Sequence, residues 1–227
     1  MGEQNNIKHI RLTGHFTILV NKPIRIKEIQ QFLYDIINKS IFFLAQLKKD
    51  FVHTGAVSPS SKSLAKNIVS IANLPERHCI VELGTGTGVF TEEILKNIYS
   101  SKFFSLELNN SFVNETKKRC PVAKVYHDDA KNLKKYLKKN NEETCDCVIS
   151  GLPWTNFDEQ IQNELLDTIY DNLGENGIFI TFTYFYTPLF PQGKNFKNKL
   201  NNKFKTVIQT KTIWNNLPPA FLYYCTK

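Results

Sequence analysis

Three glycines, each separated by one residue, follow a short apolar run and could shape a binding turn. Gly84, Gly86 and Gly88 come directly after residues 80–83, a run whose apolar side chains suit a buried strand. Glycine has no Cβ, so the backbone can turn sharply there and approach a bound molecule closely. Residues 91–93, Thr-Glu-Glu, then suit the capped, acidic first turn of a helix. The run therefore predicts a strand, a ligand-binding turn and a helix.

The spacing of these glycines indicates which of two classes of nucleotide ligand the turn binds. A dinucleotide fingerprint reads G-x-G-x-x-G, and its third glycine would fall on Val89. The chain reads G-x-G-x-G instead, with Glu82 two positions before the first glycine. This pattern resembles the cofactor turn of class I S-adenosylmethionine (SAM) methyltransferases, whose ligand is a cation with an amino-acid tail. The resemblance implies SAM as the cofactor, S-adenosylhomocysteine as its product, and Glu82 as the group that attracts the methionine ammonium.

Acidic residues also end the next two predicted strands. Glu107 ends the first of them, where a carboxylate can accept hydrogen bonds from both hydroxyls of a ribose. Asp128 and Asp129 follow the second, and we favour Asp129 as the acceptor for the adenine amino group, with Asp128 as the helix cap. The same resemblance adds further expected cofactor-binding residues, namely Ser60, Leu108, Ala130, Ser150 and Gly151.

Strands and helices alternate along most of the chain, which favours a parallel sheet covered by helices. Strands are predicted at 79–83, 102–107, 123–127, 145–150, 177–183, 205–213 and 220–226. Helices are predicted at 62–73, 89–99, 111–119, 130–139 and 158–173. We therefore expect an α/β, Rossmann-like class I methyltransferase fold with a seven-stranded, mostly parallel sheet that ends in an antiparallel β-hairpin. This domain is expected over 55–227, preceded by an extension over 1–54.

The extension carries an apolar pattern with helical spacing. Ile26, Ile29 and Leu33 begin a stripe that runs to residue 51, with lysines and arginine beside it. One interpretation is a helix that packs on the catalytic domain as a lid. The other is an interfacial helix, in which residues 22–51 contact an anionic membrane surface. The two are compatible. Residues 15–20 have some strand character but no evident partner.

Charge and cysteine content narrow the class of protein. The formal net charge of +8 and pI near 9.1 favour an anionic partner, either nucleic acid or membrane, although plain lysine enrichment is the alternative. Five cysteines without a C-x-x-C pair argue against a disulfide framework or a zinc site, so we expect no metal. The cysteines fit a reducing cytoplasm, and neither a signal peptide nor a membrane-spanning stretch is evident.

The turn after the fourth strand, Ser150-Gly151-Leu152-Pro153-Trp154, bears on the acceptor. In adenine N-methyltransferases the corresponding turn carries Asn or Asp, which holds the target amine, and an aromatic residue that stacks on the flipped base. Here Trp154 supplies the aromatic residue, but Gly151 stands at the Asn/Asp position. A flipped adenine would lose its main hydrogen-bond acceptor, and such losses cost several kcal/mol. Gly151 therefore argues against a nucleic-acid substrate.

Several segments together resemble the bacterial phospholipid N-methyltransferases, over about residues 40–227. They are Gly-Ala-Val-Ser-Pro-Ser-Ser at 55–61, the glycine turn, Ser-Gly-Leu-Pro at 150–153, Phe-Thr-Tyr at 182–184 and Asn-Leu-Pro-Pro-Ala at 216–220. That family methylates the head-group amine of phosphatidylethanolamine with SAM at the cytoplasmic face of the membrane. The resemblance implies an aminophospholipid or another amine as substrate and a peripheral location at the inner face of the membrane. Trp154 and the long N-terminal extension depart from its pattern.

The acceptor itself has weaker candidates. Tyr184 and Tyr186 follow the fifth predicted strand, and Tyr184 with Trp154 is expected to line an acceptor pocket, although wall aromatics are an equal interpretation. Lysines between 194 and 205 surround Phe196, a pattern that suits either a bilayer surface or simple solubility. A soluble small-molecule amine and, less favoured, adenine in rRNA stay as alternative acceptors.

Overall fold

The computed structural model describes residues 8–12, 16–20 and 59–227, with side chains from residue 62 onward. The chain divides into two compact units, Met1–Thr54 and Gly55–Lys227. In the first unit, strands β1 (Lys8–Leu12) and β2 (Phe16–Val20) pair in antiparallel register, so the strand character near residue 20 has a partner. The amphipathic helix predicted within 22–51 lies outside the described residues.

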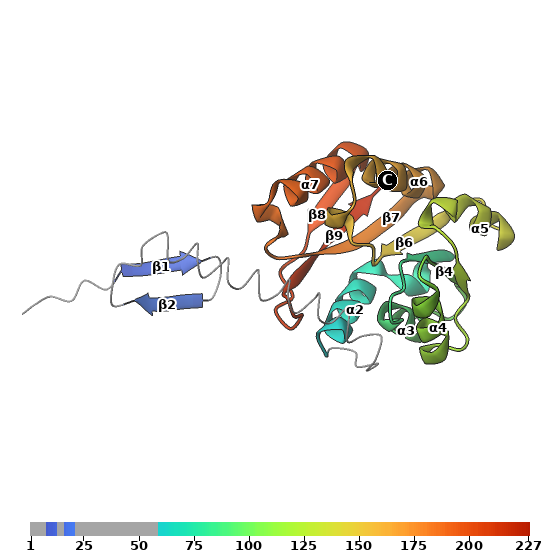
Figure 1. The fold of residues 1–227 in the computed structure, drawn as a ribbon, viewed down its shortest axis with the longest axis horizontal. Coiled ribbons are helices and arrows are strands. Elements are labelled where there is room, and N and C mark those ends of the chain that lie inside the picture. The colour runs from blue at the N-terminus through green and yellow to red at the C-terminus, as the bar shows by residue number, and fades with distance from the viewer. Residues whose placement is uncertain (1–7, 13–15, 21–58) are drawn as a thin grey trace, which may run out of the picture. The chain divides into compact units, whose positions relative to one another are not determined.

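The second unit is built on a seven-stranded sheet with the order β5-β4-β3-β6-β7-β9-β8 (Figure 1). Its strands are β3 (Cys79–Leu83), β4 (Lys102–Glu107), β5 (Val125–His127), β6 (Cys145–Ser150), β7 (Leu173–Tyr184), β8 (Thr206–Gln209) and β9 (Ala220–Thr226). The first five strands pair in parallel, whereas β9 runs antiparallel to both β7 and β8. The predicted fold class, with its C-terminal antiparallel hairpin, is confirmed.

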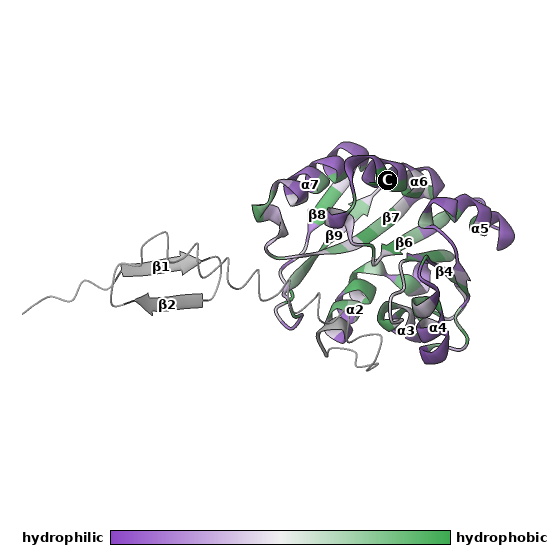
Figure 2. Cartoon of the chain, in the orientation of Figure 1, coloured by the Kyte–Doolittle hydropathy of each residue, from purple (hydrophilic) through white to green (hydrophobic). Residues whose placement is uncertain are grey.

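Helices cover both faces of this sheet. They are α2 (Pro59–Ala72), α3 (Val89–Lys96), α4 (Asn110–Arg119), α5 (Leu133–Lys139), α6 (Glu159–Asn172) and α7 (Pro191–Lys203). Neighbouring residues of β3 point to opposite faces, as the two-residue period of a strand requires. Ile80 packs with α2 and α3, whereas Val81 packs with α5, α6 and α7. Figure 2 shows the apolar strands inside and the polar helix surfaces outside.

The sequence prediction missed one helix and misjudged several ends. Helix α7 falls in a segment rich in Asn and Lys, where only Phe196 and Leu200 mark a buried face at helical spacing. Phe196 is 1% exposed and belongs to the core, so its interpretation as an aromatic inserted into a bilayer is wrong. The helix predicted at 130–139 divides into a 3-10 turn at Ala130–Asn132 and α5.

All five cysteines are buried and none is in a disulfide. Cys79, Cys147 and Cys225 lie in strands, and burial raises the pKa of each thiol to about 12. Burial likewise raises the pKa of Cys120 and of Cys145. Because the thiolate is the reactive form, these cysteines act as small apolar side chains in the folded protein.

Candidate cofactor and acceptor site

The glycine turn joins β3 to α3 at the carboxyl edge of the sheet, where open α/β folds bind ligands. Gly84, Gly86 and Gly88 all have positive φ, of +79°, +51° and +80°. A Cβ on Gly84 would lie 2.9 Å from the Leu152 side chain, and one on Gly88 would lie 3.1 Å from Thr116 Cα. A Cβ on Gly86 would meet no atom within 4 Å, so this residue borders open space.

Helix α4 holds the turn from behind. The Thr116 hydroxyl donates to the Gly86 carbonyl at 3.0 Å, and Arg119 Nε donates to the Thr87 carbonyl at 2.7 Å. These bonds satisfy carbonyl groups that the tight turn leaves without helix or strand partners. Neither Thr116 nor Arg119 was predicted to have a role. The sequence could have indicated them only by their position near the end of the helix that follows Glu107.

Glu82 is fully buried at the end of β3 and is only partly paired. The Thr91 hydroxyl donates to its Oε2 at 2.6 Å, while Oε1 is buried without a hydrogen-bond partner among the described residues. Burial is the main cause that raises the pKa of Glu82 to about 8, and the Thr91 hydrogen bond opposes it. A buried carboxylate oxygen without a partner fits a cationic ligand group. Thr91 therefore supports Glu82, and the predicted capping role belongs to Gly88.

Glu107 ends β4 and is fixed by two backbone donors. Gly86 N donates to Oε2 at 3.0 Å and Asn109 N donates to Oε1 at 2.8 Å. These bonds orient the carboxylate and leave lone pairs for hydroxyl donors of a ligand. The next residue, Leu108, is 66% exposed although it is a large apolar side chain, which suits a site covered by a flat ring.

The acidic pair after β5 is divided between two structural tasks. Asp128 accepts hydrogen bonds from Asp129 N, Asn132, Lys135 and Tyr136, and the Lys135 bond is the largest cause that holds its pKa well below the usual range. Asp129, rather than Asp128, is the N-cap, and its Oδ1 accepts from Lys131 N at 2.9 Å. The predicted capping role of Asp128 is thus corrected. Asp129 Oδ2 accepts no hydrogen bond from the described residues.

Ala130 begins the 3-10 turn beside this pair and is 9% exposed. Ser60 lies in the first turn of α2, and its side chain is outside the described set. The predicted cofactor residues with described side chains thus lie on the ends of β3, β4, β5 and β6 or on the turns that follow them.

The turn after β6 touches the glycine turn through the backbone. Gly151 N donates to the Leu83 carbonyl at 2.8 Å. A Cβ on Gly151 would lie 2.4 Å from the Gly84 carbonyl oxygen, closer than any real Cβ contact. The neighbouring Ser150 is buried, and its Oγ accepts hydrogen bonds from Leu152 N and from the Trp154 ring. Only glycine fits at position 151 with this backbone arrangement.

Trp154 was predicted to line an acceptor pocket, and the structure corrects this. The side chain is 2% exposed and stacks on Phe196 with ring centroids 5.1 Å apart. Its Nε1 donates to Ser150 at 3.1 Å, so both its apolar body and its polar atom are used inside the core. The missed helix α7 supplies Phe196, which explains why the sequence did not indicate this burial.

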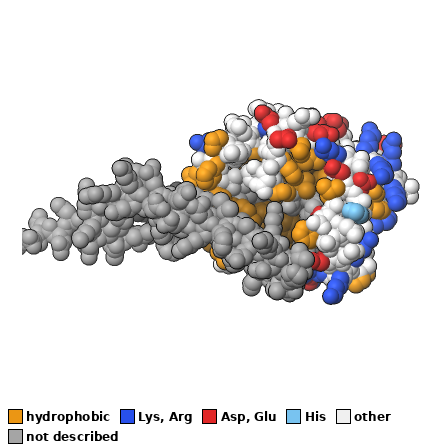
Figure 3. All heavy atoms as spheres, viewed as in Figure 1, with side chains coloured by type: hydrophobic (Ala, Val, Ile, Leu, Met, Phe, Trp, Pro, Cys, Tyr) orange, Lys and Arg blue, Asp and Glu red, His pale blue; other side chains and the backbone are white. Residues whose placement is uncertain are grey.

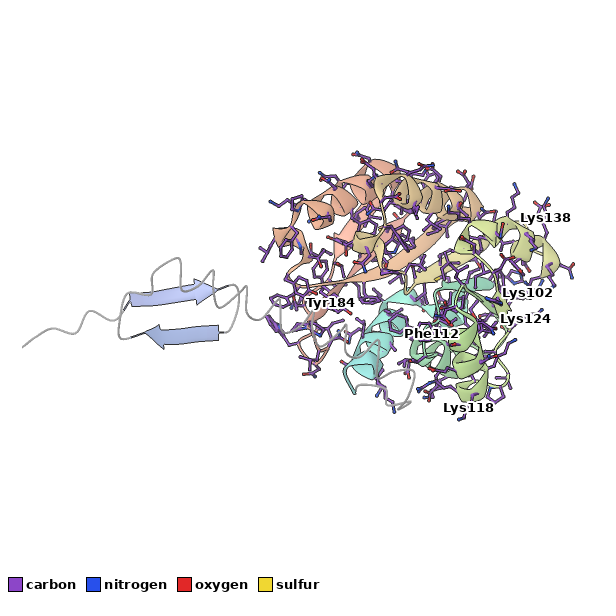
Figure 4. All side chains as sticks on the ribbon, viewed as in Figure 1. Lys102, Phe112, Lys118, Lys124, Lys138 and Tyr184 are labelled. Carbon is purple, nitrogen blue, oxygen red and sulfur yellow. The ribbon has the colours of Figure 1, made fainter. Side chains whose placement is uncertain are left out.

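Tyr184 is at the end of β7 (Figure 4) and belongs to a row of aromatic rings. Its ring stacks on Tyr186 at 5.7 Å and meets the edge of Phe182 at 5.9 Å. Phe182 in turn contacts Phe90, in the first turn of the helix that follows the glycine turn. Burial raises the pKa of Tyr184 to about 12, so its hydroxyl stays protonated at neutral pH.

Fold and site together define a class I SAM-dependent methyltransferase, and SAM is its cofactor. Residues 59–209, which are more than half of the chain, match the model of the ribosomal RNA adenine dimethylase family. The chain therefore belongs to that family.

The individual proteins that this chain resembles are named for different methyl acceptors. The ornithine lipid N-methyltransferase of Singulisphaera acidiphila is 27% identical over 187 residues, which are 81% of this chain and 93% of the relative. The SAM-bound magnesium protoporphyrin IX methyltransferase of Synechocystis superposes with a TM-score of 0.58 at 10% identity, over 74% of this chain and 80% of that one. The SAM-bound amino pentose methyltransferase CalS10 of Micromonospora echinaspora gives 0.57 at 12%, over 74% and 92%. These two likenesses show the fold.

Proposed function

We propose that this protein transfers methyl groups from SAM to the amine of an aminolipid head group, such as phosphatidylethanolamine or an ornithine lipid. The observation that carries the proposal is Gly151. In a family named for adenine dimethylation, the position that would hold the target amine has no side chain, and a Cβ there would lie 2.4 Å from the Gly84 carbonyl oxygen. The relative that methylates ornithine lipid supports the same acceptor class.

The cofactor half of the proposed mechanism rests on three carboxylates. Glu82 would face the methionine ammonium with its unpartnered oxygen, Glu107 would bind the ribose hydroxyls, and Asp129 would accept from the adenine amino group. Gly86 leaves the open space that the ligand requires. When bound, SAM supplies an electrophilic methyl group on a sulfonium. The protein aligns the amine with that methyl group and excludes water.

The acceptor half is apolar and aromatic. Tyr184, Tyr186 and Phe182 would form the wall along which the amine enters, since aromatic faces attract the alkylammonium that methylation produces. The amine must be neutral when it attacks. With a pKa of about 12, the Tyr184 hydroxyl is a hydrogen-bond donor rather than the base that takes the amine proton.

A lipid acceptor also requires a place at the membrane. None of the helices described in the structure has the length and apolar content that crossing a bilayer requires. The lipid acceptor and the net charge of +8, which favours anionic lipids, lead us to propose peripheral binding at the inner face of the membrane, with residues 22–51 as one contact.

Adenine in RNA is the second candidate, favoured by the family match and by the same basic charge. Lys102, Lys118, Lys124 and Lys138 lie at the β4–β5 side of the sheet, apart from Tyr184 (Figure 4). An RNA substrate would need both this basic side and an amine-holding group at the turn after β6. Gly151 leaves that turn without one.

Labelled SAM distinguishes the acceptors. The full chain is incubated with phosphatidylethanolamine, ornithine lipid, free ethanolamine and a ribosomal RNA transcript in parallel, and products are separated by thin-layer chromatography or gel. We expect label in a lipid and none in RNA. Label in RNA alone, or in ethanolamine at a rate equal to that of the lipid, contradicts the proposal. Gly86→Arg serves as the inactive control.

A further inference from the structure

Two loops meet at the carboxyl edge of the sheet, beside the proposed acceptor side. One spans residues 185–190 after β7, and the other spans 210–219 before β9. Phe185 N donates to the Pro219 carbonyl at 2.9 Å, which ties one loop to the other. Because β7 and β9 are neighbours in the sheet, both loops project from the edge that also carries the glycine turn.

These loops expose large apolar side chains that the core does not use. Trp214 is 70% exposed, Leu189 and Leu217 are each 60% exposed, and Phe190 is 39% exposed. Ring contacts connect the aromatic members of this group. Phe185 lies 5.9 Å from Trp214 and 5.6 Å from Tyr186, which in turn lies 6.4 Å from Phe190. We call Phe185, Leu189, Phe190, Trp214 and Leu217 the aromatic edge. Single exposed apolar residues are common on proteins, whereas a connected group marks a binding surface.

The aromatic edge is continuous with the predicted site. Tyr186 contacts Phe190 of the edge and stacks on Tyr184, which leads through Phe182 to Phe90 at the start of α3. A ligand held at this edge therefore has an aromatic path toward the glycine turn. Figure 3 shows apolar side chains gathered on the side of this unit where α7 begins, and basic ones gathered over α4 and α5.

The charge around the edge has one sign. Residues 176–227 contain seven lysines and no aspartate or glutamate. Lys194 follows Phe190 in the first turn of α7, and Lys211 precedes Trp214 by three residues; neither forms an ion pair with any described residue. Lys199 and Lys203, farther along α7, are paired with Glu159 and Asp167. Exposed rings with free lysines beside them suit the interface of an anionic bilayer.

We infer that the aromatic edge enters the head-group layer of an anionic bilayer and presents the lipid amine to the turn after β6. This inference rests on the proposed lipid substrate and adds a second membrane-binding segment, residues 185–217, to the proposed contact of residues 22–51. Trp214 and Leu217 lie at the boundary between the head groups and the acyl chains, while Lys194 and Lys211 contact lipid phosphates. The surface orients the protein so that the aromatic path opens onto the membrane.

Tryptophan fluorescence tests the surface directly, because the chain has only Trp154, which is 2% exposed, and Trp214. The full chain is mixed with vesicles of phosphatidylethanolamine and phosphatidylglycerol. We expect a blue shift of the emission and quenching by lipids brominated near the head group, both lost in Trp214→Phe. If acrylamide fails to quench Trp214 without vesicles, or if RNA and not vesicles shifts the emission, another occupant covers the edge and the inference is overturned.

Substitutions measure the contribution of the edge against matched controls. Leu217→Ser and Phe190→Ser should each weaken vesicle binding about tenfold, because each removes an apolar side chain that enters the bilayer. Tyr99→Ser and Val122→Ser remove side chains that are 88% and 83% exposed on other loops, and should leave binding unchanged. Equal effects from both pairs would overturn the inference.

A lipid that needs no membrane separates this inference from the proposed function. A short-chain phosphatidylethanolamine below its critical micelle concentration is offered to wild type and to Leu217→Ser. We expect the variant to methylate this monomeric lipid at the wild-type rate and to methylate vesicles about tenfold more slowly. Equal loss on both substrates overturns the membrane surface. Absence of wild-type activity on every aminolipid overturns the proposed function instead.

Discussion

The cofactor side and the acceptor side of the same sheet edge are built in different ways. Around the glycine turn, the polar groups are fixed by hydrogen bonds within the protein. Thr91 donates to Glu82, Asn109 N donates to Glu107, and Thr116 donates to the Gly86 carbonyl. Around the ends of β6 and β7, Gly151 has no side chain and the neighbouring surface is a row of aromatic rings. In this chain, hydrogen-bonded polar groups define the cofactor side, whereas a glycine and aromatic rings define the proposed acceptor side.

The two sides are nevertheless mechanically joined. Gly151 N donates to the Leu83 carbonyl, and the Gly84 carbonyl oxygen lies only 2.4 Å from the position that a Cβ of residue 151 would take. The glycine at 151 therefore has two consequences. It removes the polar group that would hold an adenine amine, and it lets the turn after β6 pack against the glycine turn. Variants on each side of this contact test whether the halves are separable.

The largest effect is expected from Gly86→Arg on the cofactor side. Open space around Gly86 admits the side chain, which then occupies the ligand volume, while the fold is retained. We expect calorimetric SAM binding to be abolished. Gly86→Ala is the control, because at φ +51° it adds strain of about 1–2 kcal/mol without filling the site. Retained SAM affinity in Gly86→Arg, with an unchanged circular dichroism spectrum, would remove the cofactor assignment.

Gly151→Asn is expected to have the next largest effect, and it tests the acceptor side. The new Cβ would collide with the Gly84 carbonyl, so the two turns must separate. We expect a loss of about 2–4 kcal/mol in the free energy of unfolding, measured in urea, and weaker SAM binding, without any RNA methylation. Pro153→Ala, in the same turn, controls for a general loosening. A well-folded Gly151→Asn protein that methylates RNA would show that this single residue decides the acceptor.

Glu82→Gln tests the buried, only partly paired carboxyl group of the cofactor side. The pKa of Glu82 rises from an ordinary 4.5 to about 8 in the folded protein, so between these values the folded state holds a proton that the unfolded state releases. The free energy of unfolding therefore falls as pH rises through that window, by a few kcal/mol in total. Glu82→Gln should flatten this dependence in urea titrations between pH 5 and 8.

Two controls accompany the pH experiment. Glu159→Gln changes a side chain that is 79% exposed and should keep the wild-type slope. SAM binding by the wild type should release protons below pH 8, because a ligand ammonium favours the charged carboxylate; calorimetry in buffers of different ionisation enthalpy measures this. A slope that is the same in Glu82→Gln and wild type would mean that Glu82 is ionised in the folded protein.

The smallest effect is expected from Tyr184→Phe on the acceptor side. The ring and its stacking on Tyr186 are kept, and the lost hydroxyl is not the base. We expect kcat/KM for the lipid to fall only about threefold, within the range of one neutral hydrogen bond. Tyr184→Ala, which removes the ring, should reduce it more. A loss of about a thousandfold in Tyr184→Phe would make the hydroxyl essential to proton transfer.

Local patterns were enough to predict the cofactor side of the sheet. The β3 and β4 bounds match the prediction, and Glu82, Glu107 and the three glycines all lie at one edge, because short apolar strands and glycine turns are encoded by neighbouring residues. The acceptor side depends on tertiary contacts. Trp154 looks like a pocket residue until α7 brings Phe196 onto it, and nothing adjacent to either residue indicates that contact.

The acidic pair shows the same limit on a smaller scale. Asp128 and Asp129 are adjacent, and the sequence assigned the cap to the wrong one. Which carboxylate caps a turn depends on backbone direction, and Lys135 with Tyr136 reaches Asp128 only once α5 has formed. Prediction of such pairs requires the fold first.

The buried cysteines give this molecule a practical property. Because all five thiols are enclosed and mainly protonated, the native protein should be inert to maleimides, and a cysteine introduced on a surface loop should be the single reactive position. A spin label or fluorophore placed at residue 211 or 122 would then need no prior removal of native thiols. Such a label would allow the depth of each loop in a bilayer to be measured on the otherwise native protein.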